Sequence, residues 1–274
     1  MSGVQEVSAI LRIEGGSADD GILPIYDAAQ FLVGLARASN IVANAYASND
    51  EIRKRADGAK NIKTFVQASK KGCFEEEVIF QFNERIVAEV GKSVIGNQFW
   101  DYLAFSWSAA VGVRYSPKTN YLQKKLATNE LLDHEMTEAL ESAMNELHRP
   151  IVSDREMTIE LVRPRISTPI LRFDATTLEA ITPSSEPSKM VKLIGNVTRF
   201  NVVSGFGRFF LKSEQRIVPF LLLNTNDQQL LRAASASLND TANGKGRRIF
   251  HARKVQSASG QLRRYVVEEI HEIP

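Results

Sequence analysis

Residues 191–273 read VKLIGNVTRFNV (191–202), the turn SGFG (204–207), RFFLKS (208–213), RIVPFLLL (216–223), a polar spacer, RRIFHARKV (247–255), the turn SASG (257–260) and QLRRYVVEEI (261–270). Runs rich in β-branched and aromatic residues, separated by Gly-centred turns, are typical of strands joined by hairpins. Five such strands predict a small closed β-barrel of OB-like or SH3-like kind. The segment contains no constellation that would carry a reaction, which favours binding over catalysis.

The first half of the chain predicts an α+β domain that begins β-α-β-β and continues with helices. Val7–Glu14 alternates apolar and polar residues, as a strand does, and the turn GGSADDG (15–21) follows it. Pro24–Ala47 has a helical pattern that is apolar on nearly every side and rich in small residues. We therefore expect this helix to be the central helix of the domain or part of an oligomer contact.

A hairpin is predicted next, from Ile62–Ser69 and Phe74–Phe82, with its turn at Lys70–Gly72. Helical patterns follow at Asn83–Val113 and Asn129–Leu147. Together these elements predict a domain over residues 1–150.

Residues 151–189 differ from residues 1–150 in their sequence pattern, because they are typical of extended chain that prolines interrupt. Within them Ile181–Lys189 (ITPSSEPSK) has the composition of a linker. The predicted organisation is therefore an α+β domain at 1–150, an extended connector at 151–189 and a β-barrel at 190–274.

Charge is distributed unevenly along the chain. The whole sequence has 34 Lys and Arg, 32 Asp and Glu, and a formal net charge of +2. Residues 1–150 carry 16 basic and 20 acidic side chains, and residues 151–274 carry 18 basic and 12 acidic side chains. A moderately basic module is compatible with an anionic partner such as nucleic acid.

Cys73 is the single cysteine, which excludes a disulfide framework and a cysteine-built zinc site. The N-terminus lacks the pattern of a signal peptide. The most apolar run, Phe99–Val113, contains Asp101 and is shorter than the roughly 20 residues that span a bilayer. We therefore expect a cytoplasmic protein without membrane segments.

Templates for catalysis and for cofactors do not fit. The pair His134-Glu135 resembles the start of the zinc motif of metalloproteases. That motif needs a second histidine four residues after the first, and position 138 is Glu138. Gly205-Phe206-Gly207 leads into a strand rather than a helix, so it predicts a turn instead of a dinucleotide loop. We therefore predict no catalytic residue, no metal site and no cofactor, which leaves enzymatic activity open but disfavoured.

Basic and aromatic residues gather on the predicted barrel strands. Small barrels bind single-stranded nucleic acid by stacking bases on aromatic rings beside a cationic groove. The candidate contacts are Arg199, Arg208, Arg247, Arg248, Arg253, Lys254, Arg263 and Arg264. The alternative is that Phe209, Phe220 and Phe250 fill the barrel while the charged side chains cover its surface.

A second candidate surface is the aromatic-rich helix in the first half, with Trp100, Tyr102, Phe105 and Trp107. Tryptophan and tyrosine are enriched at protein interfaces. The same pattern is typical of a helix buried in a core, so both readings stay open.

The string GNVTRFNVVSGFGRFFLKSEQRIVPFLL, with RRIFHARKVQSASGQLRRYVVEEIHEI after it, resembles a small barrel module of uncharacterised bacterial families. The hairpin VQASKKGCFEEEVIF, which follows the alanine-rich helix, is similar to such families as well. Some of them occur on mobile elements and beside phage-defence genes, so the resemblance implies a role in antiviral defence. No catalytic residue carries over from it.

Three functions follow as hypotheses. The first is a non-enzymatic binding or scaffold protein that assembles with copies of itself or with a protein effector. The second is a protein that binds single-stranded nucleic acid through the basic face of the barrel. The third is an enzyme or a nucleotide-ligand sensor with a pocket between the domains.

Overall fold

The structure is a computed structural model that describes residues 3–53, 58, 61–67, 74–129, 132–166, 168–183, 189–258, 260 and 262–273. The chain divides into two compact units, Met1–Ile181 and Thr182–Pro274. The predicted fold class, α+β with a closed five-stranded barrel near the C-terminus, is confirmed.

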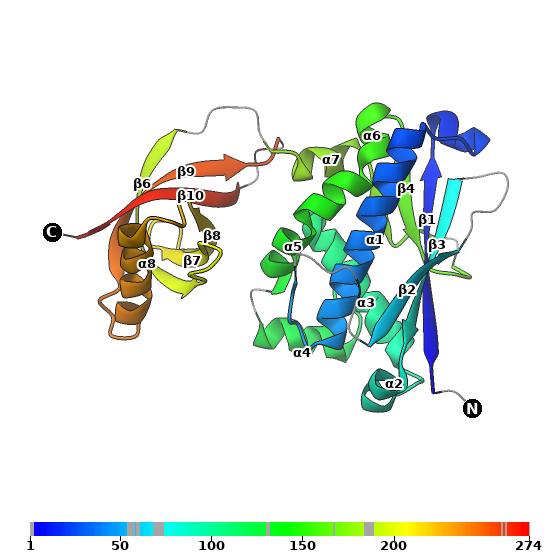
Figure 1. The fold of residues 1–274 in the computed structure, drawn as a ribbon, viewed down its shortest axis with the longest axis horizontal. Coiled ribbons are helices and arrows are strands. Elements are labelled where there is room, and N and C mark those ends of the chain that lie inside the picture. The colour runs from blue at the N-terminus through cyan, green and yellow to red at the C-terminus, as the bar shows by residue number, and fades with distance from the viewer. Residues whose placement is uncertain are drawn as a thin grey trace. The chain divides into compact units, whose positions relative to one another are not determined.

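Unit 1 combines one antiparallel sheet with a layer of helices (Figure 1). Its strands are β1 (Gln5–Glu14), β2 (Ile62–Gln67), β3 (Phe74–Phe82), β4 (Thr158–Val162) and β5 (Leu171–Phe173). Its helices are α1 (Ile25–Ala47), α2 (Glu84–Val90), α3 (Ile95–Ala110), α4 (Asn120–Thr128), α5 (Leu132–Leu147), α6 (Arg149–Ser153) and α7 (Ala175–Ile181), with the short 3₁₀ helix η1 (Gly16–Asp20) after β1.

The sheet has the order β2-β3-β1-β4-β5, so β1 lies at its centre. Every second residue of β1, beginning with Val7 and ending with Ile13, is buried, and the residues between them are not. Since successive side chains of a strand point to opposite faces, one face of the sheet forms the core. Helices α1, α3 and α5 lie on that face (Figure 1).

The structure differs from the predicted elements in three places. The predicted helical stretch Asn83–Val113 is divided into α2 and α3. The stretch between the two predicted helices contains α4, a short additional helix capped by Thr119. Most of the predicted connector is folded into unit 1, where β4 pairs with β1 and β5 pairs with β4. Prolines bound this strand pair rather than interrupt it, because Pro164 and Pro169 lie in the loop between β4 and β5.

Asp101, the acidic residue inside the most apolar helix, has a structural role. Its buried carboxylate accepts hydrogen bonds from the Tyr115 hydroxyl (2.8 Å), from the Lys118 backbone N–H (3.0 Å) and from both the backbone N–H and the hydroxyl of Thr119 (2.7 and 2.6 Å). A buried charge is tolerated when hydrogen-bond donors surround it. This carboxylate therefore anchors the loop that leads into α4.

Unit 2 is a closed barrel with the ring order β10-β8-β7-β6-β9. Its elements are β6 (Met190–Phe200), β7 (Phe206–Leu211), β8 (Arg216–Leu222), α8 (Gln228–Thr241), β9 (Arg247–Gln256) and β10 (Leu262–Glu272). Strands β8 and β10 pair in parallel, and the other neighbours pair antiparallel. This ring, with a helix between the third and fourth strands, is OB-like rather than SH3-like.

Aromatic side chains fill the barrel. The ring of Phe209 lies 5.4 Å from that of Phe220, 4.9 Å from that of Phe250 and 5.9 Å from that of Tyr265, measured between centroids. All four side chains are buried. The sequence alternative in which these phenylalanines form the barrel core is confirmed.

Two predicted features fall partly or wholly outside the described residues. The strands of the first hairpin pair as predicted, but its turn at Lys70–Gly72 and Cys73 lie outside them. Most of the predicted linker, residues 184–188, does so as well.

Candidate functional site

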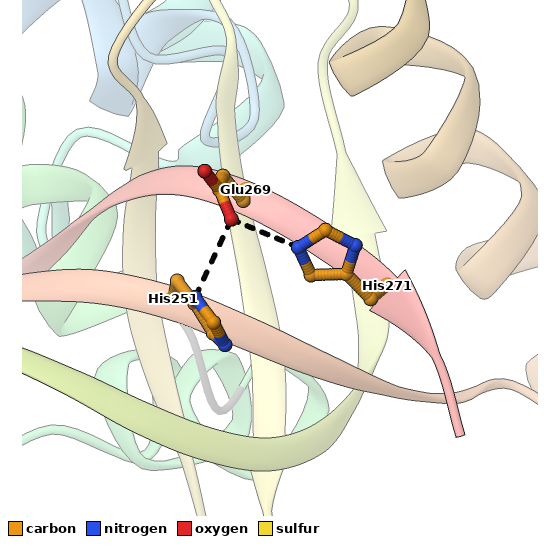
Figure 2. A group of neighbouring side chains, drawn as sticks. All are labelled: His251, Glu269 and His271. Atoms are coloured by element: carbon orange, nitrogen blue, oxygen red, sulfur yellow. Dashed lines mark hydrogen bonds and ion pairs between the residues drawn. The ribbon is translucent and has the colours of Figure 1, made fainter. Parts of the chain in front are cut away.

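The hairpin of β9 and β10 carries a cluster of two histidines and one glutamate on the outer face of the barrel (Figure 2). His251 lies on β9 directly opposite Glu269 of β10. His271 lies two residues beyond Glu269, so it shares the same face of the strand. Side chains on directly opposed and diagonal positions of neighbouring strands are close enough to interact.

A β-bulge in β10 helps to build this cluster. The register of β10 against β9 shifts between Val267 and Glu269. Glu268 pairs with Arg253, and its neighbour Glu269 pairs with His251, although Arg253 and His251 point to the same side of β9. In a regular strand two consecutive glutamates would point to opposite faces, so the bulge brings both to the outer face.

Both imidazole rings approach one oxygen of the carboxylate. Nε2 of His271 lies 2.9 Å and Nδ1 of His251 lies 3.4 Å from Oε2 of Glu269. One potential ligand atom from each residue can be chosen so that all three lie within 4.8 Å of one another. Figure 2 shows the interactions of the two rings meeting at one oxygen of the Glu269 carboxylate.

The electrostatics of the cluster favour an ionised glutamate. The hydrogen bond from His271 lowers the pKa of the Glu269 carboxyl, and the charges of His271 and His251 act in the same direction. On its other side, β9 pairs with β6, where Lys192 lies opposite His251. Lys192 is exposed, so its flexible ammonium group can extend into solvent.

The predicted nucleic-acid contacts do not form one cationic surface. Arg208 is 0% exposed, and Arg248 is buried and pairs with Asp240 at 2.6 Å. These two side chains therefore do not belong to an exposed basic face. Arg253 is exposed but forms an ion pair with Glu268.

The remaining predicted contacts are spread over the barrel. Arg199 and Arg247 are exposed, whereas Lys254, Arg263 and Arg264 are half-buried. Glu268, Glu269 and Glu272 lie among them on β10. The hairpin surface is therefore mixed in charge, which is a weaker attraction for phosphate than the sequence count suggested.

The predicted aromatic interface belongs to the core. Trp100, Tyr102, Phe105 and Trp107 are between 0% and 6% exposed on α3. They pack with the other core residues of unit 1. These rings therefore provide no exposed contact surface, and of the two sequence readings the structure agrees with the buried helix.

Apolar side chains are exposed elsewhere, in the N-terminal part of α1 and just before it. Residues three or four apart on a helix share a face, as Ile25, Ala29, Leu32 and Ala36 do. The large exposed members are Ile22 (63%), Ile25 (89%), Tyr26 (60%), Leu32 (38%) and Val33 (47%). We call this set, with the exposed Ala29 and Ala36, the α1 stripe.

A polar pocket of about 430 Å³ lies beside the glycine-rich turn of unit 1. It contains both signs of charge, since Arg12 and Arg172 line it together with Glu14, Asp19 and Glu156. Arg12 is engaged by Glu75 at 3.1 Å, an interaction that raises the pKa of the guanidinium. The pocket lies within unit 1, and its lining carries two arginines and three carboxylates, so no strong excess of one charge marks it for a charged ligand.

The sequence matches the model of a protein family described as a domain of unknown function, DUF7946, over residues 9–182. The chain belongs to the DUF7946 family. This match ends where unit 2 begins, so the family domain corresponds to unit 1 and the barrel is a separate module.

Other comparisons add little. No curated protein matches the sequence. Among solved structures, a mutant of the ferredoxin protease FusC in complex with Arabidopsis ferredoxin aligns with 10% identity and a TM-score of 0.16. The alignment covers 80% of this chain and 29% of that chain. So low a score carries no argument about fold or function.

The sequence reasoning missed the histidine–glutamate cluster. A signal was present, because Glu269 and His271 are two apart in a predicted strand and therefore share a face. The partner residue on β9 could not be assigned, since the bulge changes which residues stand opposite each other.

Proposed function

We propose that this protein is a non-enzymatic scaffold that assembles with a second copy of itself through the α1 stripe. The observation that carries the proposal is the exposure of five large apolar side chains around the start of one helix. Single exposed apolar residues are common on soluble proteins, but contiguous ones mark interaction surfaces.

The rest of α1 is occupied within unit 1, which leaves this face for a partner. Its other side packs against α5 at Gly34, and Asp27 at its first turn is buried and pairs with Arg149 at 2.9 Å. Arg149 in turn lies over the ring of Tyr26, 5.1 Å from its centroid. The stripe is therefore held in place by side chains beside it.

A second copy is the partner that the chemistry of the stripe favours. The stripe carries no charged side chain, so two copies of it do not repel each other. In a two-fold symmetric dimer the same patch is used by both subunits. The small residues Ala29 and Ala36 allow two such helices to approach closely.

The stripe would form the centre of the contact rather than its whole area. Stable interfaces bury about 800 Å² on each partner, so we expect residues around the stripe to contribute to the contact. Among the described residues no helix is long and apolar enough to cross a bilayer. We propose that the protein acts in the cytoplasm, and the sequence resemblance supports a role in antiviral defence.

The test is the mass in solution over a range of concentrations, measured by sedimentation velocity. We expect a dimer for the unchanged protein and a monomer for the double variant Ile25→Asp, Leu32→Asp. Val203→Asp is the matched control, since Val203 is 92% exposed but lies on a loop of the barrel. A monomeric unchanged protein, or a stripe variant that stays dimeric, contradicts the proposal.

A further inference from the structure

The cluster of His251, Glu269 and His271 has a composition that distinguishes it from ordinary surface ion pairs. Among the described residues, these are the three neighbouring side chains whose ligand atoms lie close enough together to hold a metal ion. Its members come from two strands that are hydrogen-bonded to each other. The backbone of a closed barrel therefore fixes the points from which the three side chains start.

The donor atoms select the class of ion. Two imidazole nitrogens and one carboxylate oxygen suit zinc and its transition-metal neighbours. Calcium and magnesium prefer sites made of oxygen alone. In zinc sites with three protein ligands, a water or another molecule takes the fourth position.

The distances agree with such a site. Zinc–nitrogen bonds of about 2.0–2.1 Å in a tetrahedron place neighbouring ligand atoms about 3.3 Å apart. In this structure Oε2 of Glu269 lies 2.9 Å from Nε2 of His271 and 3.4 Å from Nδ1 of His251. All three ligand atoms lie within 4.8 Å of one another, so rotations about the bonds of the three side chains can bring them to one ion.

We propose that His251, Glu269 and His271 bind one divalent transition-metal ion of the zinc class on the outer face of the β9–β10 hairpin. The site keeps a fourth position open to solvent, because Glu269 and His271 are exposed. Bound there, the ion ties β9 to β10 beyond the bulge, near the C-terminal end of the last strand.

The test measures zinc binding by tag-free protein in isothermal titration calorimetry. We expect one equivalent of Zn²⁺ to bind, and we expect His251→Ala and His271→Ala to weaken the affinity at least about tenfold. Glu269→Gln keeps the size of the side chain while it removes the negative charge, so it tests the carboxylate. His134→Ala removes a histidine outside the cluster and is expected to bind as the unchanged protein does.

A spectroscopic measurement shows whether the bound ion is four-coordinate. Co²⁺ in a four-coordinate site absorbs visible light strongly, and we expect this absorption for the unchanged protein and for His134→Ala, with its loss in His271→Ala. Circular dichroism of each variant establishes that the barrel is still folded. The proposal is wrong if the unchanged protein binds no Zn²⁺, or if folded His251→Ala and His271→Ala bind as tightly as it does.

The metal site is independent of the α1 stripe, so the two proposals fail separately. If the protein binds Zn²⁺ but is monomeric, the scaffold proposal is wrong and the metal site stands. If it is dimeric but does not bind Zn²⁺, the metal proposal is wrong and the scaffold proposal stands.

Discussion

Gly34 of α1 lies against the backbone of Leu147 in α5. A Cβ atom at position 34 would stand 2.3 Å from the Leu147 nitrogen and 2.7 Å from the carbonyl oxygen of Ala143. The helices can approach this closely only without a side chain at position 34. This contact fixes which face of α1 is buried and, as a consequence, which face forms the stripe.

Gly34→Ala is expected to destabilise unit 1. Overpacking costs about 1–3 kcal/mol, and the better helix propensity of alanine offsets about 1 kcal/mol of it. Urea unfolding followed by tryptophan fluorescence measures the effect, because Trp100 and Trp107 are both in α3 and report on unit 1. Gly96→Ala is the control, since its Cβ would meet Val7 at 3.9 Å, and we expect it to be neutral or stabilising.

Asp101→Asn is expected to cost about 2–3 kcal/mol of the free energy of unfolding. The amide group of asparagine would point a donor at backbone N–H groups that now donate to the carboxylate, and unsatisfied buried groups are costly. The same fluorescence experiment measures it. Asp20→Asn, at an exposed position in η1, should change stability by less than about 0.5 kcal/mol. Equal effects of the two substitutions would contradict this role for Asp101.

We expect the folded protein to lose stability in mild acid because of the buried imidazole of His148. Burial lowers the pKa of this imidazole from 6.5 to about 4, while its Nδ1 and Nε2 interact with the Met144 carbonyl oxygen and the Thr177 hydroxyl. Below pH 6.5 the imidazole takes up a proton in the unfolded chain but not in the folded protein. Protonation therefore stabilises the unfolded state relative to the folded state. The loss reaches about 3 kcal/mol as the pH falls to about 4.

The pH prediction is checked by comparing unfolding at pH 7.5 and pH 5 in the unchanged protein and in His148→Asn. We expect the variant to be less stable at pH 7.5 but to change less between the two values. His134→Asn should keep the original pH dependence. The same slope in the unchanged protein and in His148→Asn would show that this histidine is not responsible.

Arg248→Ala is expected to destabilise the barrel, whereas Arg247→Ala is not. The Arg248 guanidinium pairs with Asp240 at 2.6 Å and donates to the carbonyl oxygens of Lys245 and Arg247 at 3.0 and 2.9 Å. Its removal leaves these acceptors without their donor, at a cost of about 2–3 kcal/mol. Scanning calorimetry of the two variants measures the difference, and equal melting temperatures would refute the structural role of Arg248.

Several elements could be predicted because their signals are local. Alternation in Val7–Glu14, the turn at Gly205 and the strand pattern from Lys192 onward depend on neighbours in sequence. The fold class followed from the order of such elements. The three phenylalanines of the barrel core were foreseen as one of two alternatives, because alternation within each strand shows which residues share a face but not which face is inside.

Other features depend on residues that are distant in sequence. The sequence could not assign β4 to the sheet, since its pairing with β1 spans most of unit 1. Arg208 and Arg248 were predicted from the sequence to be surface charges. Their burial could not be foreseen, because burial is a property of the packed structure and not of a residue type. The sequence grouped Trp100, Tyr102, Phe105 and Trp107 as one helix segment without deciding whether the helix is buried.

By itself, then, the sequence determined the two-module organisation, the strands of the barrel and the apolar character of the α1 helix, because hydrophobic period and turn chemistry are written in neighbouring residues. The tertiary structure alone decided which face of α1 stays exposed and that His251 meets Glu269 and His271. The first depends on the backbone contact at Gly34, and the second on a bulge that shifts the register of two strands.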